Sequence, residues 1–247
     1  MFIPIDYLFI MSLVGLYLYD SAILCFYNNI FICKGIRKHF KYQCISLNFS
    51  FGKKFVLMPS LIFPYQLLFK GHWQLHNRSI TNLDQDLLNI KKITQLLKPL
   101  QFINIILFIA TILLLPVFII LEFSYLLLAL LIFGIYLLNL LNFTYIVLKR
   151  KSLHLSKRHL FQFLLDVLFC PPFSLNILRK ISLNYAIHTD SIILNQHLLQ
   201  RPQYIQFLDE ISQNIEVLKS NYEISDRSYT LLVQRQIELS KLKSNQE

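Results

Sequence analysis

One long stretch without a basic residue constrains this chain more than any other feature. Residues 99–148 contain neither Lys nor Arg, and Glu122 is the single acid among them. Two apolar runs, 102–121 and 125–148, flank that acid, and an α-helix of about 20 residues is enough to cross the hydrocarbon core of a bilayer. Residues 122–124 leave room only for a tight turn. The stretch therefore predicts a transmembrane helical hairpin.

The composition agrees with a membrane class. Only 15% of the residues are charged and the mean hydropathy is +0.48, whereas soluble domains carry about 25% charged residues. The net charge of +10 is unevenly distributed: residues 1–33 and 99–148 hold no Lys or Arg, while 34–98 hold eleven and 149–180 hold seven. Cytoplasmic flanks of membrane spans collect basic residues. We therefore expect the N-terminus outside, 34–98 inside, the turn outside and the C-terminal region inside.

The N-terminal segment allows two interpretations. Residues 2–19 form an apolar stretch with Asp6 near its start, and Asp20 follows directly. Either one helix runs from about residue 3 to 33 with Asp20 at its middle, or a shorter span ends near Asp20 and a β-hairpin with an Asn28-Asn29 turn follows. A charge at the bilayer centre costs about 2.5–3.5 kcal/mol on insertion scales, which favours the shorter span.

Further elements follow from periodicity and turn residues. A second β-hairpin is predicted from strands 42–49 and 54–58 around 50–53. An amphipathic helix is predicted over 81–98, with an N-cap at Thr81-Asn82 and an end before Pro99. Beyond the membrane hairpin we expect an interfacial helix at 156–170, stopped by Pro171-Pro172, and helices near 174–183, 190–199, 202–220 and 227–243. The 202–220 helix is expected to carry an apolar stripe of Tyr204, Phe207, Leu208, Ile211, Ile215 and Leu218.

The expected fold is a mainly α-helical integral membrane protein with three transmembrane helices, one N-terminal and two in the hairpin. A small β-rich cytoplasmic insertion and a helical C-terminal region complete it. The segments are 1–21 (the first span, extended to 33 in the longer interpretation), 22–80 (the β-rich insertion), 81–98 (an interfacial helix), 99–148 (the hairpin), 149–200 (interfacial helices) and 201–247 (soluble cytoplasmic helices).

A few polar residues are candidates for function. An ionisable residue inside a span suggests a proton relay or a polar helix contact, so Asp20 is one candidate, although an interfacial position wetted by headgroup water is favoured. Asn139 and Asn142 are three residues apart and share a helix face, where amides commonly bond between helices. A basic cluster is predicted to face anionic lipid headgroups, although topology alone would also explain it. The cluster consists of Lys149, Arg150, Lys151, Lys157 and Arg158.

Metal, cofactor and catalytic motifs are not indicated. The chain has no CxxC, and neither His72 with His76 nor His154 with His159 has a convincing ligand arrangement. With only five glycines, a glycine-rich phosphate loop is not expected. We therefore predict no metal, no cofactor and no nucleic-acid partner.

Two strings carry a resemblance. Gly52-Lys53-Lys54-Phe55 with Pro59 and residues 64–73 form one, and residues 170–180, from Cys170-Pro-Pro to Arg179-Lys180, form the other. Both are similar to uncharacterised small inner-membrane proteins of proteobacteria, and the resemblance brings no activity with it. It implies a bacterial inner membrane, with an organelle inner membrane as the alternative.

The expected function is that of a non-enzymatic accessory or scaffold subunit that binds lipid bilayer and other membrane proteins. The alternative is a lipid- or envelope-related enzyme or transporter component that uses Asp20 with His154, His159 and Asp166. A third hypothesis is a regulator that senses membrane state through the interfacial helices.

Overall fold

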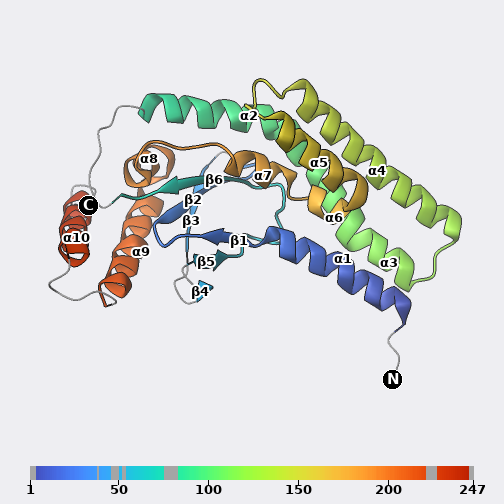
Figure 1. Cartoon of the computed structure of the whole chain (residues 1–247), viewed down its shortest axis with the longest axis horizontal. Helices are drawn as coiled ribbons and strands as arrows, with labels where there is room; N and C mark the ends of the chain where they lie inside the picture. The colour runs from blue at the N-terminus through green and yellow to red at the C-terminus, as the bar shows by residue number, and fades with distance from the viewer. Residues whose placement is uncertain are drawn as a thin grey trace. The chain divides into compact units, whose positions relative to one another are not determined.

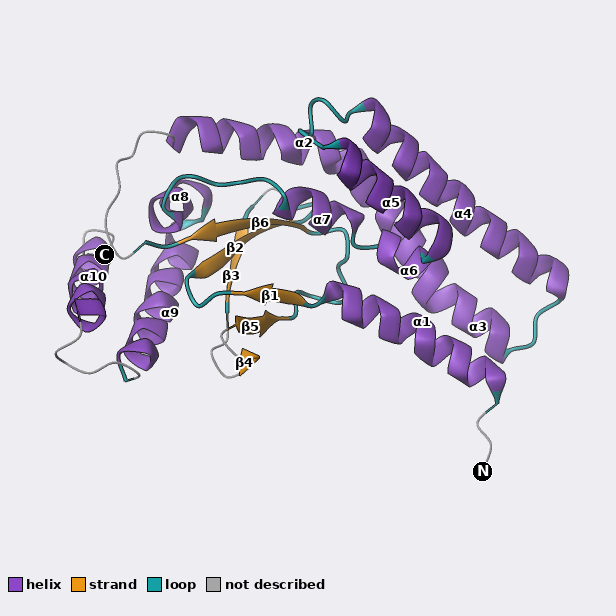
Figure 2. Ribbon diagram, in the orientation of Figure 1, coloured by secondary structure: helices purple, strands orange, loops and turns teal. Residues whose placement is uncertain are grey.

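The computed structural model describes residues 4–37, 39–45, 50–51, 54–74, 83–220 and 227–244. These residues form two compact units (Figure 1). Unit 1 consists of residues 1–23, 58–67 and 92–184, and unit 2 of residues 24–57, 68–91 and 185–247. Most of the described chain is helical, and the strands occur between residues 23 and 72 (Figure 2).

Unit 1 is built from helices around an apolar core. Its elements are α1 (Ile5–Ser21), the part of α2 (Leu83–Phe108) from Lys92 onward, a π-helical segment η1 (Ile109–Leu114), α3 (Leu115–Ile120), α4 (Tyr125–Leu148), α5 (Lys157–Phe169), α6 (Pro171–Ser174) and α7 (Ile177–Leu183). The buried core of this unit comprises Leu13, Tyr17, Leu107, Ala110, Leu115, Ile135 and Leu175. It joins α1 to the long α2–α3 helix and to α4.

The two apolar helices of the sequence prediction are present. One continuous helix covers Leu83–Ile120 and the next covers Tyr125–Leu148, and both are long and apolar enough to cross a membrane. The turn between them is tight: the N–H of Phe123 donates to the carbonyl of Phe118 at 3.1 Å, and that of Glu122 to Ile119 at 3.2 Å. Glu122 has a φ of 50°. These features form a Schellman motif, in which a left-handed residue ends the helix.

The prediction that a helix ends before Pro99 is wrong, because Pro99 lies inside α2. A proline inside a helix removes one N–H and crowds the preceding turn, but Leu97 and Leu100 on either side are buried and hold the helix in place by packing. A second proline, Pro116, follows η1, where Leu115 N–H bonds to the carbonyl of Ala110. This wider turn accommodates a residue that cannot donate. The proposed N-cap at Thr81-Asn82 lies outside the described residues.

The N-terminal helix ends at Ser21, so the longer interpretation of a helix to residue 33 is wrong. Ala22 is extended, and β1 (Ile23–Cys25) begins directly after it. Asp20 therefore occupies the last turn of α1 and not its middle.

The strands form two three-stranded sheets, ordered β1-β5-β4 and β3-β2-β6. The remaining strands are β2 (Asn29–Lys34), β3 (Lys41–Cys44), β4 (Ser50–Phe51), β5 (Lys54–Leu57) and β6 (Leu67–His72). In the antiparallel β2–β3 pair, Ile30 lies opposite Cys44 and Cys33 opposite Lys41. Consecutive strands therefore pair as β2–β3 and β4–β5, whereas β1–β5 and β2–β6 join strands that are not consecutive in the chain.

Neither predicted hairpin is correct in full. β1 and β2 belong to different sheets, because residues 26–29 form a corner in which Asn29 Oδ1 accepts from the N–H of Phe26 at 3.0 Å. The second hairpin exists only as β4–β5, with Phe51 opposite Lys54. Its expected first strand, 42–49, is replaced by β3, which pairs with β2, and residues 46–49 and 52–53 lie outside the described part of the chain.

Three helices complete unit 2: α8 (Ser191–Leu198), α9 (Arg201–Lys219) and α10 (Arg227–Ser244). The apolar stripe expected on α9 is confirmed, since all six of its residues are buried: Tyr204, Phe207, Leu208, Ile211, Ile215 and Leu218. They pack in one core with Trp73, Ile192 and residues of α10.

Candidate functional site

Asp20 lies in a charged cluster of unit 1. The Nζ of Lys180, on α7, is 2.9 Å from Asp20 Oδ1 and 2.9 Å from Asp166 Oδ2, so one ammonium bridges two carboxylates from α1 and α5. The aromatic ring of Phe173 lies 5.3 Å from the same ammonium. The three charged side chains are between 13% and 28% exposed. The cluster therefore joins acids from two helices to one shared cation.

Hydrogen bonds extend the cluster toward the interior. Asn176 Nδ2 donates to Asp20 Oδ2 at 3.0 Å and to Ser21 Oγ at 3.1 Å. Arg179, which is 2% exposed, donates through Nη1 to Asn176 Oδ1 at 3.2 Å and through Nη2 to the carbonyls of Ser60 and Phe63. The cluster thereby ties the end of α1 to α7 and to the 58–67 segment.

The charges in this cluster compensate one another. Two carboxylates face two cations, and each oxygen of Asp20 has its own donor. Pairing and hydrogen bonding are what a charge outside bulk water requires. The arrangement is that of a structural clamp. Both oxygens of Asp20 are used in contacts that hold α1 against α7.

The sequence identified Asp20 but not its partners. Lys180 and Asn176 lie more than 150 residues further along the chain, and no spacing rule connects them to α1. Both lie in the 170–180 string that the sequence had already drawn attention to. The histidines of the alternative hypothesis are elsewhere: among the described residues, no hydrogen bond or ion pair joins His154 or His159 to Asp20 or Asp166.

The two asparagines of α4 face the protein interior. Asn139 is 1% exposed and accepts through Oδ1 from Ser174 Oγ at 2.6 Å, linking α4 to α6. Asn142 is 6% exposed, and its Oδ1 has no hydrogen-bond partner within the described chain. Asn139 thus makes an interhelical bond of the kind expected for such amides.

The basic cluster extends beyond α4. Lys149, Lys151, Lys157 and Arg158 are exposed, whereas Arg150 is half-buried and donates through Nε to the carbonyl of Leu155 at 3.1 Å. His154 has a φ of 52° and ends the helical turn that follows α4, just as Glu122 ends α3. These cations are available to anions at one end of α4.

Buried carboxylates in unit 2 also serve the fold. Asp86 accepts from the backbone N–H groups of His188 and Thr189 and from the hydroxyl of Thr189. Asp190 caps α8 through the N–H of Ile192 and pairs with Arg235 at 2.6 Å. The described residues contain no group of three His, Cys, Asp or Glu side chains placed to hold a metal ion, and His76 lies outside them.

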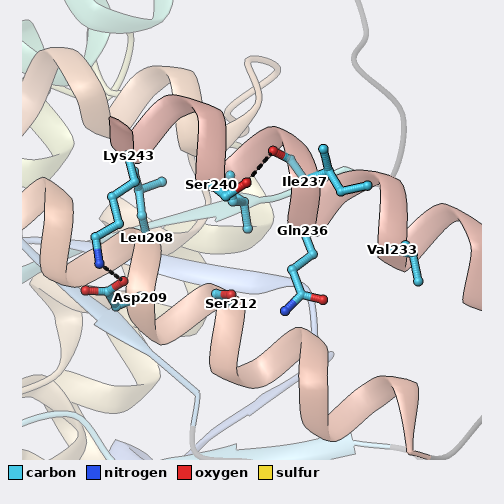
Figure 3. Close-up of a pocket in the computed structure, with 9 residues that line it drawn as sticks. Leu208, Asp209, Ser212, Val233, Gln236, Ile237, Ser240 and Lys243 are labelled. Carbon is cyan, nitrogen blue, oxygen red and sulfur yellow. Dashed lines mark hydrogen bonds and ion pairs between the residues drawn. The ribbon is translucent and has the colours of Figure 1, made fainter. Parts of the chain in front are cut away.

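A groove lies between α9 and α10 in unit 2 (Figure 3). It has a volume of about 350 Å³ and is lined by apolar and polar side chains together. Lys243 crosses one end to reach Asp209 Oδ1 at 2.7 Å, and Ile237, which also lines it, is 51% exposed. Part of its apolar lining is therefore open to solvent.

Comparison with known proteins does not identify a family for this chain. No protein-family model matches the chain, and no curated protein or solved structure is significantly similar to it.

Proposed function

We propose that this protein is a non-enzymatic accessory or scaffold subunit of a membrane assembly, anchored through unit 1 and binding other proteins through unit 2. The anchor would consist of three spans: α1, the 83–120 helix and α4. The proposed location of the protein is a bacterial inner membrane, with an organelle inner membrane as the alternative. Charge distribution supports an outside N-terminus and a cytoplasmic C-terminus.

The uncovered surface of α4 carries this proposal. Only 17% of the most apolar 18-residue segment of α4 is buried by the rest of the protein. The apolar core helix of a soluble protein is mostly buried. Leu126, Phe133 and Leu148 are each more than 65% exposed. An apolar surface of this extent in water is an aggregation liability, and a bilayer covers it.

Two further helices support the same environment. On α1, Ile5, Phe9 and Met11 are at least half exposed, and its 17 residues extend for about 25 Å. On α5, Phe161 and Phe169 are 60% and 80% exposed, as expected for an amphipathic helix that lies against lipid.

The scaffold role is supported by what the polar residues do. The Asp20–Lys180–Asp166 group is internally compensated, and the carboxylates of unit 2 hold loops and helix ends. The enzyme or transporter alternative remains second, because its histidines do not meet its carboxylates in the described residues.

Two measurements test the proposal. Extraction of native membranes with alkaline carbonate should leave the protein in the pellet, and release into the supernatant would refute the membrane anchor. Tagged protein purified in a mild detergent should carry a stoichiometric partner protein, whereas a lone monomer would refute the scaffold role.

A matched pair of variants locates the contact. Ile237→Glu places a charge in the α9–α10 groove and should release the partner, whereas Gln234→Glu adds the same charge at an exposed position of α10 that does not line the groove. Equal partner recovery with both variants would exclude the groove as the contact surface. Reporter fusions at residues 122–124 and at the C-terminus test the orientation.

A further inference from the structure

A cavity in unit 1 lies between α1 and α4. Its volume is about 350 Å³, within the range of ligand sites. Leu13 and Leu16 of α1, Leu115 of α3 and Ile135 of α4 contribute apolar walls, and the Phe169–Pro172 connection contributes to one side. All of these residues belong to unit 1.

The lining is suited to hydrocarbon and unsuited to water. Its polar side chains are Ser12, Thr111, Tyr136 and Cys170, and none carries a formal charge. Burial raises the pKa of the Cys170 thiol, which keeps it neutral. The hydroxyl of Thr111 is itself buried, and that of Tyr136 faces the carbonyl of Leu168 at 3.5 Å. Ordered water needs two to four polar partners at one point, and apolar cavities stay dry or bind apolar molecules.

The cavity opens among side chains that α1 and α4 leave uncovered. Leu13, Leu115 and Ile135 are at most 7% exposed and form its floor, whereas Phe9 and Ile132 are 52% and 40% exposed at its rim. Ile132 and Ile135 are near the middle of α4, and Leu13 is near the middle of α1. The opening therefore falls at the depth where the proposed bilayer consists of hydrocarbon chains.

The dimensions of the cavity suit a hydrocarbon chain better than an α-helix. An α-helix is about 10–12 Å in diameter with its side chains, so 350 Å³ would hold less than one turn of it. The wall formed by α1 from Phe9 to Leu16 is about 10 Å long, a large part of the roughly 15 Å thickness of one leaflet's hydrocarbon. An extended hydrocarbon chain fits that shape.

We propose that this cavity binds one acyl chain of a bilayer phospholipid. The proposal rests on the membrane anchoring of unit 1 and extends it, since it assigns a specific lipid position between α1 and α4. A chain held there fills the space between two helices whose direct packing the cavity interrupts. The lipid thereby becomes part of the helix packing of the anchor.

Photocrosslinking tests this inference directly. The full-length protein is reconstituted in nanodiscs containing a trace of phosphatidylcholine with a diazirine at mid-chain, irradiated and digested. Crosslinks should concentrate on peptides that contain residues 9–16, 132–136 and 169–172. An even spread over the exposed surface of α4 would overturn the cavity proposal and leave the membrane anchor intact, whereas release by alkaline carbonate would refute the anchor itself.

Variants give the test its control. Ile132→Trp and Leu16→Trp extend rim side chains into the cavity and should each lower crosslinking at 9–16 and 169–172 by about tenfold, because the chain loses buried apolar contact. Leu130→Trp adds the same group on α4 at a 57% exposed position that does not line the cavity. It should leave those crosslinks within about twofold of wild type. A similar effect from all three variants would overturn the proposal.

Discussion

Two ion pairs on α10 form a matched test of how burial sets the strength of a charge pair. Arg235 Nη2 lies 2.6 Å from Asp190 Oδ2, and Lys243 Nζ lies 2.7 Å from Asp209 Oδ1. The first two side chains are each 2% exposed, whereas the second two are 35% and 47% exposed. Both cations lie on α10 and the two distances are almost the same. The pairs differ in burial, in the surrounding bonds and in the cation, which is a guanidinium in the first and an ammonium in the second.

The expected magnitudes differ several-fold. Removing one partner of a buried pair costs about 3–5 kcal/mol because a charge is left without its counterion. Asp190 would keep the N–H groups of Gln74 and Ile192, so we expect Arg235→Met to lower the free energy of unfolding by about 3 kcal/mol, at the lower end of that range. Lys243→Met should lower the free energy of unfolding by about 0.2–1 kcal/mol, which is what an exposed ion pair contributes.

The single tryptophan makes the assay specific. Trp73 is 2% exposed in the core that contains α9 and α10 residues, so its fluorescence reports on unit 2 during urea unfolding of the full chain in a mild detergent. Arg235 also pairs with Glu238, which is 45% exposed, and Glu238→Gln controls for that contact. If Arg235→Met destabilised unit 2 no more than Lys243→Met does, the argument from burial would be refuted.

Three further predictions concern particular residues. Glu122→Gly should raise the free energy of unfolding by up to about 1 kcal/mol in thermal melts, because Glu122 has a φ of 50° that glycine adopts without a side-chain clash; a lower melting temperature would contradict the strain. Asp20→Asn should lower the free energy of unfolding by about 1–2 kcal/mol, and Lys180→Met should lower it further, because the latter leaves two carboxylates without their shared cation. A larger loss from Asp20→Asn than from Lys180→Met would contradict the clamp. The pKa of His72 should lie below its ordinary 6.5 in an NMR titration, since burial and then Lys70 lower it. The contribution of this histidine to the free energy of unfolding is therefore complete above about pH 6.5 and declines as the pH falls. An NMR titration midpoint of His72 above 6.5 would refute the lowered pKa.

The neutral form of His72 also follows from the hydrogen bonds around it. Asn29 Oδ1 accepts from Phe26 N–H, so Asn29 Nδ2 is the group that faces His72 Nδ1 at 2.7 Å. The imidazole nitrogen must accept there and cannot carry a proton. Protonation of His72 would replace that bond with two opposed N–H groups.

Local patterns predicted helices better than sheets. The apolar stripe of α9 and the turn at 122–124 follow from residues close in sequence, and both are present as expected. Two of the four strand pairs among the described residues do not: β2 pairs with β6 as well as with its neighbour β3, and β1 pairs with β5. These two pairs join segments distant in sequence, so the Asn28-Asn29 signal identified a change of direction but not the partners on either side.

Pro99 shows the same limit within a helix. By local rules it ends α2, yet buried neighbours at positions 97 and 100 carry the helix through it. Packing energy gained over several residues outweighs a local cost of about 3 kcal/mol.

The sequence by itself determined that this chain contains two long apolar helices joined by a tight turn, because the absence of Lys and Arg over 99–148 and the length of the runs need no tertiary context. It also singled out Asp20. Only the tertiary structure decided what Asp20 does, since Lys180 and Asn176 reach it from more than 150 residues away. The physical reason is general: an apolar helix is encoded by consecutive residues, whereas the partner of a charge is chosen by the packing of segments that the chain brings together only when it folds.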